Sequence, residues 1–263
     1  MAPIRVVVTG ARGRMGTETM RAVLQQEDLL LVGGVDEPGA AGRSVAAITG
    51  LPVDLTLGRD LVEEIESKKP EVLVDFTTPD AVMGNLRTAL KHKVACVVGT
   101  TGLRPADLEE LSALCEKVET PAFVAPNFAI GAVLMMQFAA QAARHFGSAE
   151  IIELHHDKKK DAPSGTALRT AELMTKAEGS LLSGGEAPGQ PSPRGLGFEK
   201  IRLHSVRLPG LVAHQEVIFG GLGQTLTIRH DSISRESFMP GVLLAIRKVR
   251  GLRGLVVGLE NIL

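Results

Sequence analysis

The chain has 263 residues, a formal net charge of −1, and neither tryptophan nor tyrosine. This length can bury the core of one large domain or of two moderate domains. The balanced charge provides no basic surface for nucleic acid, and the missing aromatic side chains remove the usual platforms for stacked bases. We therefore expect no nucleic-acid partner.

Several features indicate a cytoplasmic protein without a membrane partner. The sequence enters a strand-like segment at Ile4, with no charged region and long apolar run of a secretory signal before it. The most apolar long segment, residues 128–143, is interrupted by a glycine and a glutamine and is too short to span a bilayer. Cys96 and Cys115 fall in apolar segments, which is typical of thiols in a reducing compartment.

The start of the chain has the order of a dinucleotide-binding unit. A β-branched run at residues 4–9 predicts a buried strand, and the turn GARGRMG follows it. An amphipathic helix is expected over residues 15–26, and a second apolar strand over residues 29–35 ends at Asp36. Strand, glycine-rich turn, helix, strand and acidic residue in this order predict a dinucleotide site.

Three glycines of the turn have separate expected roles. Gly10 makes the tight turn, Gly13 lets the backbone approach the pyrophosphate, and Gly16 allows close packing of the helix. Their GxxGxxG spacing is one residue longer at the first gap than the standard GxGxxG. Asp36 lies 20 residues beyond Gly16, where a carboxylate can bind a ribose hydroxyl. A glycine-rich turn alone is weak evidence, so the flanking elements and Asp36 carry the prediction.

Helices and strands continue to alternate to about residue 127. Helices are expected at 61–67, from Pro79 with Thr78 as its cap, and at 105–118, and strands at 72–75, 94–98 and 122–125. This alternation predicts a parallel, doubly wound sheet whose ligands gather at the carboxyl ends of the strands. The residues expected to bind the cofactor are Gly10, Ala11, Arg12, Gly13, Arg14, Met15, Asp36, Phe76, Thr77, Gly99, Thr100, Thr101, Ala125, Pro126, Asn127 and Phe128. Thr77 and Thr100 could equally belong to ordinary strand-to-helix turns.

The second half predicts a smaller α+β domain. The expected elements are helices at 130–146 and 164–177, a loop at 178–197, and strands at 149–154, 200–206, 212–219 and 224–230. The last two strands join through a glycine-rich hairpin, so we expect a mostly antiparallel four-stranded sheet. His204, His214 and His230 lie in these strands and are expected to be structural.

We divide the chain at two positions. Residues 1–127 form the dinucleotide-binding domain, and residues 128–238 form a domain for substrate binding and oligomerisation. Residues 239–263, a helix at 239–249 and a short strand at 255–259, return to the first domain.

The segment ELHHDKKKDAPSGTA at residues 153–167 concentrates the chemically active side chains. Ser164 is a good N-cap, and the first N–H groups of the helix after it can bind an anion. Lysines upstream would strengthen that site, and neighbouring imidazoles can transfer protons near neutral pH. A small carboxylate substrate fits this set, although lysine runs are usually solvated. A metal site is not expected, because consecutive residues of an extended chain, such as His155 and His156, point to opposite sides.

The motifs GARGRMG, DFTTPD, GTTG, APNF and HHDKKKDAPSGTA together resemble the 4-hydroxy-tetrahydrodipicolinate (dihydrodipicolinate) reductase family, nearly end to end. The resemblance implies a Rossmann domain and a four-stranded substrate domain whose sheets join in a homotetramer. It also implies hydride transfer from NADH or NADPH to C4 of a cyclic dicarboxylate, with loss of a hydroxyl as water, on the diaminopimelate route to lysine. By position in the motif, His155 resembles the catalytic proton donor/acceptor and Lys159 the cationic proton donor. His156, Ser164, Gly165 and Thr166 resemble the substrate-binding residues, and Lys158 and Lys160 are expected to be solvated.

One departure from the family pattern concerns the cofactor. Many members carry a basic residue after the acidic end of the second strand, whereas this chain has Asp36 followed by Glu37. A carboxylate suits a ribose hydroxyl and repels a 2′-phosphate, so we expect NADH to be preferred. Arg12, Arg14 or Arg43 could still accommodate NADPH.

Two other functions share features of this sequence. A homoserine or aspartate-semialdehyde dehydrogenase shares the two-domain plan, but the latter needs an exposed nucleophilic cysteine, and neither Cys96 nor Cys115 is expected to be exposed. A non-catalytic NAD(H)-binding regulator could keep the fold, but it would not need the proton donors His155 and Lys159.

Overall fold

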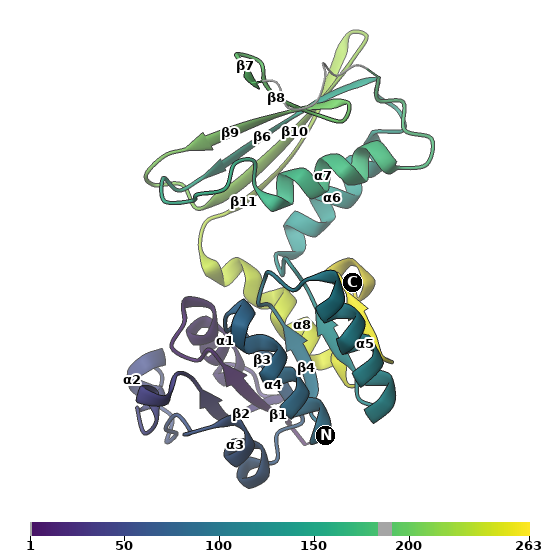
Figure 1. Cartoon of the computed structure of the whole chain (residues 1–263). Coiled ribbons are helices and arrows are strands. Elements are labelled where there is room, and N and C mark those ends of the chain that lie inside the picture. Colours follow the sequence, from purple (N-terminus) through teal and green to yellow (C-terminus); the bar gives the residue numbers. More distant parts are fainter. Residues whose placement is uncertain (1, 184–190) are drawn as a thin grey trace. The chain divides into compact units, whose positions relative to one another are not determined.

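The computed structural model describes residues 2–183 and 191–263 (Figure 1). They divide into two compact units. The first comprises the chain up to Phe128 together with Phe238–Leu263, and the second is Ala129–Ser237. In the described part of the chain, no helix has the length and apolar character needed to cross a membrane.

The first unit is built on a six-stranded parallel sheet in the order β12-β5-β4-β3-β1-β2. Its strands are β1 (Ile4–Thr9), β2 (Leu29–Val35), β3 (Val72–Asp75), β4 (Ala95–Val98), β5 (Ala122–Val124) and β12 (Leu255–Val257). The β-branched and apolar strands β3 and β4 are buried along their whole length, as expected when helices cover both faces of a parallel sheet. The last strand, β12, pairs with β5.

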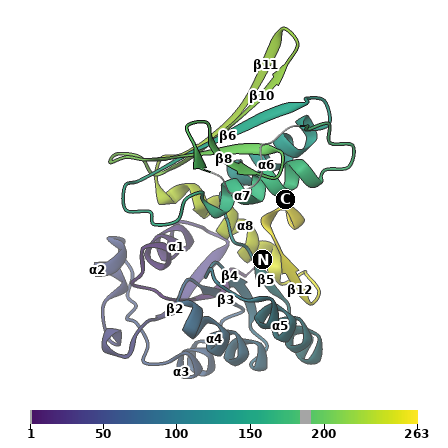
Figure 2. The ribbon, with the colours of Figure 1, turned by 45° about the horizontal axis from the view of Figure 1, so that its top comes forward.

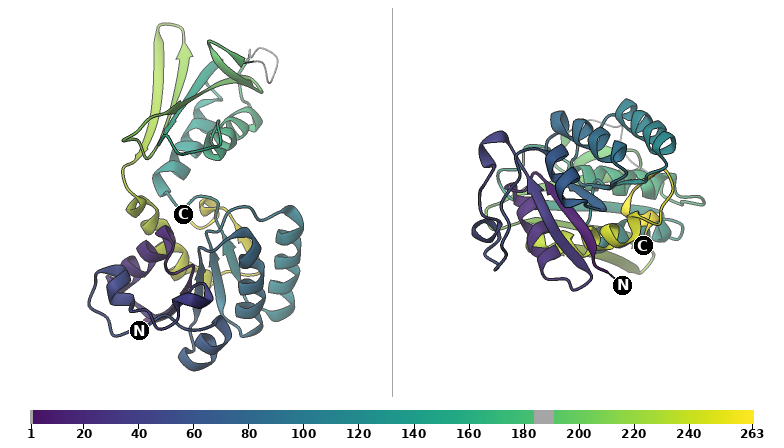
Figure 3. Two further views of the ribbon diagram at one scale, coloured as in Figure 1. Left: turned by 60° about the vertical axis from the view of Figure 1, so that its left-hand side comes forward. Right: turned by 90° about the horizontal axis from the view of Figure 1, so that it is seen from below.

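Two groups of helices cover this sheet (Figure 3). α1 (Arg14–Leu24) and α8 (Met239–Val249) contact each other, and α3 (Leu61–Lys68), α4 (Pro79–Lys91) and α5 (Pro105–Val118) follow one another as the second group. Leu86, Leu90 and Leu111 of the second group are fully buried against the strands. The doubly wound parallel sheet predicted from the sequence is confirmed.

The second unit contains a mixed six-stranded sheet in the order β11-β10-β6-β9-β8-β7 (Figure 2). Its strands are β6 (Ser148–His155), β7 (Pro191–Ser192), β8 (Gly195–Phe198), β9 (Ile201–Arg207), β10 (Ala213–Gly221) and β11 (Gln224–Ser232). β6 and β9 are parallel, and the other neighbours are antiparallel. α6 (Ile130–Ala142) and α7 (Gly165–Lys176) pack together and contact the sheet, with Ile151, Met174 and Phe219 fully buried in the shared core.

The four expected strands of this sheet are present as β6, β9, β10 and β11, but the sheet has six strands and the expected total of four is wrong. The added pair, β7 and β8, lies in the predicted loop 178–197 apart from Phe198, and glycine and proline there hide the alternation that marks a strand. Part of that loop, residues 184–190, lies outside the described residues.

Two local expectations need correction, and one helix was not expected. The helix expected over 130–146 ends at Ala142. Thr78 occupies the N-cap position of α4, but its side chain makes no capping hydrogen bond within the described chain. The short helix α2 (Val45–Thr49) was not predicted, because its five residues are too few to show a helical period.

Candidate functional site

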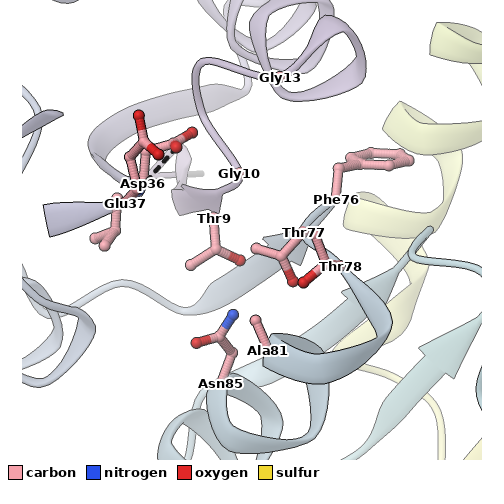
Figure 4. Close-up of a pocket in the computed structure, with 11 residues that line it drawn as sticks. Thr9, Gly10, Gly13, Asp36, Glu37, Phe76, Thr77, Thr78, Ala81 and Asn85 are labelled. Atoms are coloured by element: carbon pink, nitrogen blue, oxygen red, sulfur yellow. Dashed lines mark hydrogen bonds between the residues drawn. The ribbon is translucent and has the colours of Figure 1, made fainter. Parts of the chain in front are cut away.

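A cavity of about 510 Å³ opens at the carboxyl ends of β1, β2 and β3 in the first unit (Figure 4). The residues that line it are Thr9, Gly10, Gly13, Val35, Asp36, Glu37, Phe76, Thr77, Thr78, Ala81 and Asn85. Its volume lies within the range of roughly 300–1,000 Å³ that is usual for small-molecule sites. In a doubly wound sheet this edge is where ligands bind.

The glycine-rich turn has the tight geometry expected from the sequence. Gly10 has a φ of +72°, and a Cβ there would lie 2.4 Å from the carbonyl oxygen of Phe76. A Cβ on Gly16 would lie 2.0 Å from the carbonyl oxygen of Gly10, so only glycine lets α1 approach the turn this closely. Gly13 is the N-cap of α1 and supplies no side chain, which leaves the first N–H groups of the helix accessible to an anion.

Two carboxylates and one guanidinium organise the end of β2. Asp36 accepts hydrogen bonds from the backbone N–H of Arg12 (2.7 Å) and of Glu37 (2.8 Å). Nη1 of Arg12 in turn lies 2.7 Å from Oε1 of Glu37. The carboxylate of Asp36 is therefore held at the cavity, and Arg12 is engaged by an acidic neighbour.

Sequence reasoning missed the buried carboxylate of Asp75, which joins several strand ends below the cavity. Its oxygens accept from the hydroxyls of Thr9 (2.8 Å), Thr77 (2.7 Å) and Thr100 (2.6 Å), and from the side-chain amide of Asn85 (2.8 Å). Figure 4 shows Asn85 of α4 opposite Thr9 and Thr77. Asp75 and Thr9 end strands that the sequence predicts, so their position was a usable signal, whereas Asn85 lies inside a helix and has none.

The structure separates the expected cofactor residues into those that line the cavity and those that do not. Gly10, Gly13, Asp36, Phe76 and Thr77 line it. The others, which lie outside the lining, are Ala11, Arg12, Arg14, Met15, Gly99, Thr100, Thr101, Ala125, Pro126, Asn127 and Phe128.

Two aromatic residues differ in their surroundings. Phe128 is only 3% exposed, and its ring lies 5.9 Å from that of Phe76 and 6.1 Å from that of Phe123, measured between centroids. Phe128 thus packs against the ring of Phe76, a residue that lines the cavity.

In the second unit, the end of β6 places His155 beside a buried acid. Nδ1 of His155 lies 2.5 Å from Oε2 of Glu153, whose side chain is fully buried. Arg207 of β9 donates to both oxygens of Glu153, at 2.8 and 2.7 Å. Burial alone would raise the pKa of Glu153, but hydrogen bonds from His155, Arg207 and Ser205 outweigh it and lower the pKa to about 2.

The lysines that follow separate as the sequence predicts. Lys158 and Lys160 are exposed, whereas Lys159 is partly buried and its Nζ lies 2.8 and 2.9 Å from the two carboxylate oxygens of Asp161. The backbone N–H of Lys159 donates to the carbonyl of the half-buried His156 (3.1 Å), which closes the turn after β6. Asp161 holds the Lys159 ammonium at a position that an anionic ligand could share.

The start of α7 also follows the prediction. Ser164 is the N-cap, and its hydroxyl accepts from the N–H of Ala167 (3.2 Å). Its own N–H donates to Glu153 (3.2 Å). Gly165 is exposed, and a Cβ built there would meet no atom of the described chain within 4 Å. The N–H groups of Gly165 and Thr166 begin the helix and so have no intrahelical acceptor.

The three histidines of the later strands and the two cysteines have structural surroundings. His204 contacts Glu150 and His214 contacts Asp231, while burial lowers the pKa of His230. Cys96 and Cys115 are free and buried, and burial raises the pKa of Cys115 to about 11. Buried, protonated thiols are poor nucleophiles, which removes the basis for an aspartate-semialdehyde dehydrogenase. Across residues 2–183 and 191–263, no three His, Cys, Asp or Glu side chains are placed to hold a metal ion.

Known proteins similar to this chain cover both units. Two family models match, "Dihydrodipicolinate reductase, N-terminus" at residues 4–128 and "Dihydrodipicolinate reductase, C-terminus" at residues 131–263. A relative from Moorella thermoacetica named 4-hydroxy-tetrahydrodipicolinate reductase is 54% identical, with 100% of this chain and 99% of the relative covered. One of the same name from Desulfitobacterium hafniense is 49% identical, with both chains fully covered.

Solved structures give the same comparison. A dipicolinate-bound dihydrodipicolinate reductase from Paenisporosarcina sp. TG-14 has a TM-score of 0.85 and 42% identity, over 99% of this chain and 100% of that one. An amine dehydrogenase from Mycobacterium smegmatis has a TM-score of 0.68 at 15% identity, over 96% of this chain and 94% of that one. The second likeness concerns the fold alone.

Proposed function

The chain belongs to the dihydrodipicolinate reductase family, and we propose that it reduces 4-hydroxy-tetrahydrodipicolinate to tetrahydrodipicolinate with a reduced nicotinamide cofactor. This reaction is a step of the diaminopimelate route to lysine. The observation that carries the proposal is the joint placement of His155, Lys159 and the start of α7 around one buried acid–guanidinium pair. A protein that only binds a nucleotide has no use for that arrangement.

The residues of the first unit fit a dinucleotide. The turn at Gly10 and Gly16 brings the backbone close to the start of α1, where free N–H groups can bind a pyrophosphate. Asp36 at the end of β2 can accept from a ribose hydroxyl. When bound, the nicotinamide supplies the hydride. The protein's part at this site is to hold the ring and ribose in one orientation, for which Phe76 and Thr77 are placed.

The residues of the second unit fit a small dicarboxylate. The N–H groups of Gly165 and Thr166, with the hydroxyl of Thr166, can donate hydrogen bonds to one carboxylate at the start of α7. The Lys159 ammonium, held by Asp161, can pair with substrate charge, and His156 lies in the same turn. The dipicolinate bound by the 42% identical relative is itself a cyclic dicarboxylate. Each charge-assisted hydrogen bond of this kind contributes about 1.5–3 kcal/mol.

Proton transfer at this site falls to His155 and Lys159. The Lys159 ammonium, paired with Asp161, can supply a proton as the hydroxyl leaves as water. Nδ1 of His155 faces Glu153, so Nε2 is the nitrogen available to exchange a proton with the substrate.

We further propose that NADH is preferred over NADPH. The support is the pair of carboxylates, Asp36 and Glu37, that lines the ribose end of the cavity and would repel a 2′-phosphate. Arg12 could counter this repulsion, but it is paired with Glu37 at 2.7 Å.

The test of this preference is Glu37→Ala, which releases Arg12 and removes one negative charge. The ratio of kcat/KM for NADPH to that for NADH should rise by roughly tenfold or more. Glu27→Ala removes an exposed carboxylate outside the cavity lining and serves as the matched control. A clear NADPH advantage in the unaltered protein would show that the preference is wrong.

We also propose a homotetramer. The supporting feature is the edge strand β11 of the second sheet, which is largely exposed and includes Leu226 at 38% exposure. Sedimentation velocity at micromolar concentration tests it, and a monomer there would contradict it.

The activity itself is tested by following the absorbance of the reduced nicotinamide as NADH is consumed. The substrate is made in situ from pyruvate and aspartate semialdehyde by the preceding synthase. Rapid oxidation that depends on the synthase is expected. NADH binding without oxidation would favour the non-catalytic regulator instead.

A further inference from the structure

We propose that Glu153 and Arg207 act as a positioning pair that fixes the tautomer of His155 and anchors both the Lys159 turn and the start of α7. This inference rests on the proposed function for the roles of His155 and Lys159. It adds two residues that contact neither substrate nor cofactor and act through the groups that do.

Glu153 is an exception to the pattern of its own strand. Alternate residues of β6 point to the same face, and those before Glu153, Ala149 and Ile151, are buried apolar side chains of the core. Glu153 continues this row as an ionisable residue with no exposed surface. A buried carboxylate is costly unless several donors satisfy it, so its presence at a core position needs an explanation.

The donors around Glu153 supply that explanation, because they come from three separate elements. Oε2 lies 2.5 Å from Nδ1 of His155 and accepts from Nη1 of Arg207 at 2.8 Å. Oε1 accepts from Nη2 of Arg207 at 2.7 Å and from the N–H of Ser164 at 3.2 Å. One carboxylate thus joins the end of β6, strand β9 and the N-cap of α7.

The contact with His155 selects a tautomer. An ionised carboxylate can only accept hydrogen bonds, and hydrogen bonds from Arg207 and Ser164 keep Glu153 ionised. Nδ1 of His155, which faces Glu153, must therefore carry a proton and donate it to the carboxylate. This hydrogen bond orients the ring and leaves Nε2 for the substrate.

Arg207 extends the same control to Lys159. It lies directly across from His155 in the parallel pairing of β6 and β9. Its Nη2 donates to the backbone carbonyl of Asp161 at 2.7 Å as well as to Glu153, and the side chain of Asp161 pairs with Lys159. The planar guanidinium can make these bonds together in a fixed geometry, which a lysine at this position could not reproduce.

The experiment compares Glu153→Gln and Arg207→Lys with Glu150→Gln. Glu150 is the matched control, because it is an acid on the same strand that pairs instead with His204 at 2.8 Å and with Arg194 at 2.9 Å. For each protein we would measure kcat, substrate KM, NADH affinity by fluorescence, and the imidazole 15N shifts of His155.

Glu153→Gln should lower kcat by roughly 10²-fold while KM changes much less and NADH affinity stays within about twofold. The 15N shifts of His155 should change from a single Nδ1–H tautomer to a mixture. Arg207→Lys should also lower kcat, as Glu153→Gln does. Glu150→Gln should leave kcat and the 15N shifts of His155 unchanged.

Two results would overturn the inference. One is a single Nδ1–H tautomer retained in Glu153→Gln together with unaltered kcat. The other is an equal fall of kcat in Glu150→Gln. The 15N readout needs no turnover, so an inactive wild-type protein would refute the proposed function while the tautomer result still decides this inference. If Glu153→Gln does not fold, Arg207→Lys decides it by the same readouts.

Discussion

Replacing Glu153 with glutamine should weaken the fold at neutral pH and flatten its response to acid. The pKa of this buried carboxyl is lowered from 4.5 to about 2 in the folded protein. At 1.36 kcal/mol for each pKa unit, this corresponds to a stabilisation on the order of 3 kcal/mol. Removing the charge also leaves Arg207 without its buried partner, and breaking such a pair typically costs about 3–5 kcal/mol. The two figures agree.

The sign of the pH dependence follows from which state takes up the proton first. The folded pKa is lower than the unfolded one, so the unfolded chain binds the proton first as the pH falls. The stabilisation is complete above pH 4.5 and disappears as the pH falls toward about 2. The difference in unfolding free energy between wild type and Glu153→Gln should therefore be largest at pH 7 and shrink within this window.

Urea unfolding followed by circular dichroism at several pH values gives this difference directly. Glu172→Gln is the control, because Glu172 forms ion pairs with Arg169 and Lys176 on the surface of α7, where such pairs are screened by solvent. It should leave the pH dependence nearly unchanged. The reasoning would be refuted if the unfolding free energies of wild type and Glu153→Gln fell equally steeply with pH. A difference between the two unfolding free energies below about 1 kcal/mol at pH 7 would also refute it.

Three further perturbations test other parts of the site. Lys159→Ala should lower kcat by roughly 10²–10⁴-fold with NADH affinity near normal, and unchanged turnover would remove Lys159 from the catalytic role. Gly16→Ala should cost about 1–3 kcal/mol and abolish NADH binding, because its Cβ would lie 2.0 Å from the Gly10 carbonyl oxygen. Gly84→Ala in α4 meets open space and should instead stabilise by about 1 kcal/mol, so equal thermal shifts for the two would contradict the packing argument. Asp75→Asn should weaken NADH binding by roughly tenfold or more, since an amide cannot accept from Thr9, Thr77, Thr100 and Asn85 together, and titration calorimetry with unaltered affinity would show that the network is only structural.

Local patterns in the sequence predicted most of the fold because the strands and the longer helices of the first unit carry their own hydrophobic periods. β3 and α5 begin and end at the predicted residues, and Ser164 caps α7 as expected. The two strands that were missed, β7 and β8, have two and four residues, and β8 is half glycine, so neither shows a readable alternation.

Site residues could be predicted where they belong to a local sequence motif. They could not be predicted where only contacts between distant segments bring them to the site. The turn at Gly10 and the acid at Asp36, which the motif singles out, both line the cavity. Arg207 reaches Glu153 across 54 positions of the chain, and only the pairing of β9 with β6 brings them together. Asn85 reaches Asp75 from within α4, where one polar residue among many gives no signal.

The most direct test of the central claim follows the hydride itself. NADH labelled with deuterium at the transferred position is mixed with the protein, pyruvate, aspartate semialdehyde and the preceding synthase, and the product is analysed by mass spectrometry. We expect one deuterium in tetrahydrodipicolinate, dependent on the synthase and lost in Lys159→Ala. Unlabelled product, or NADH that binds and is never oxidised, would contradict the assignment of this chain as the reductase.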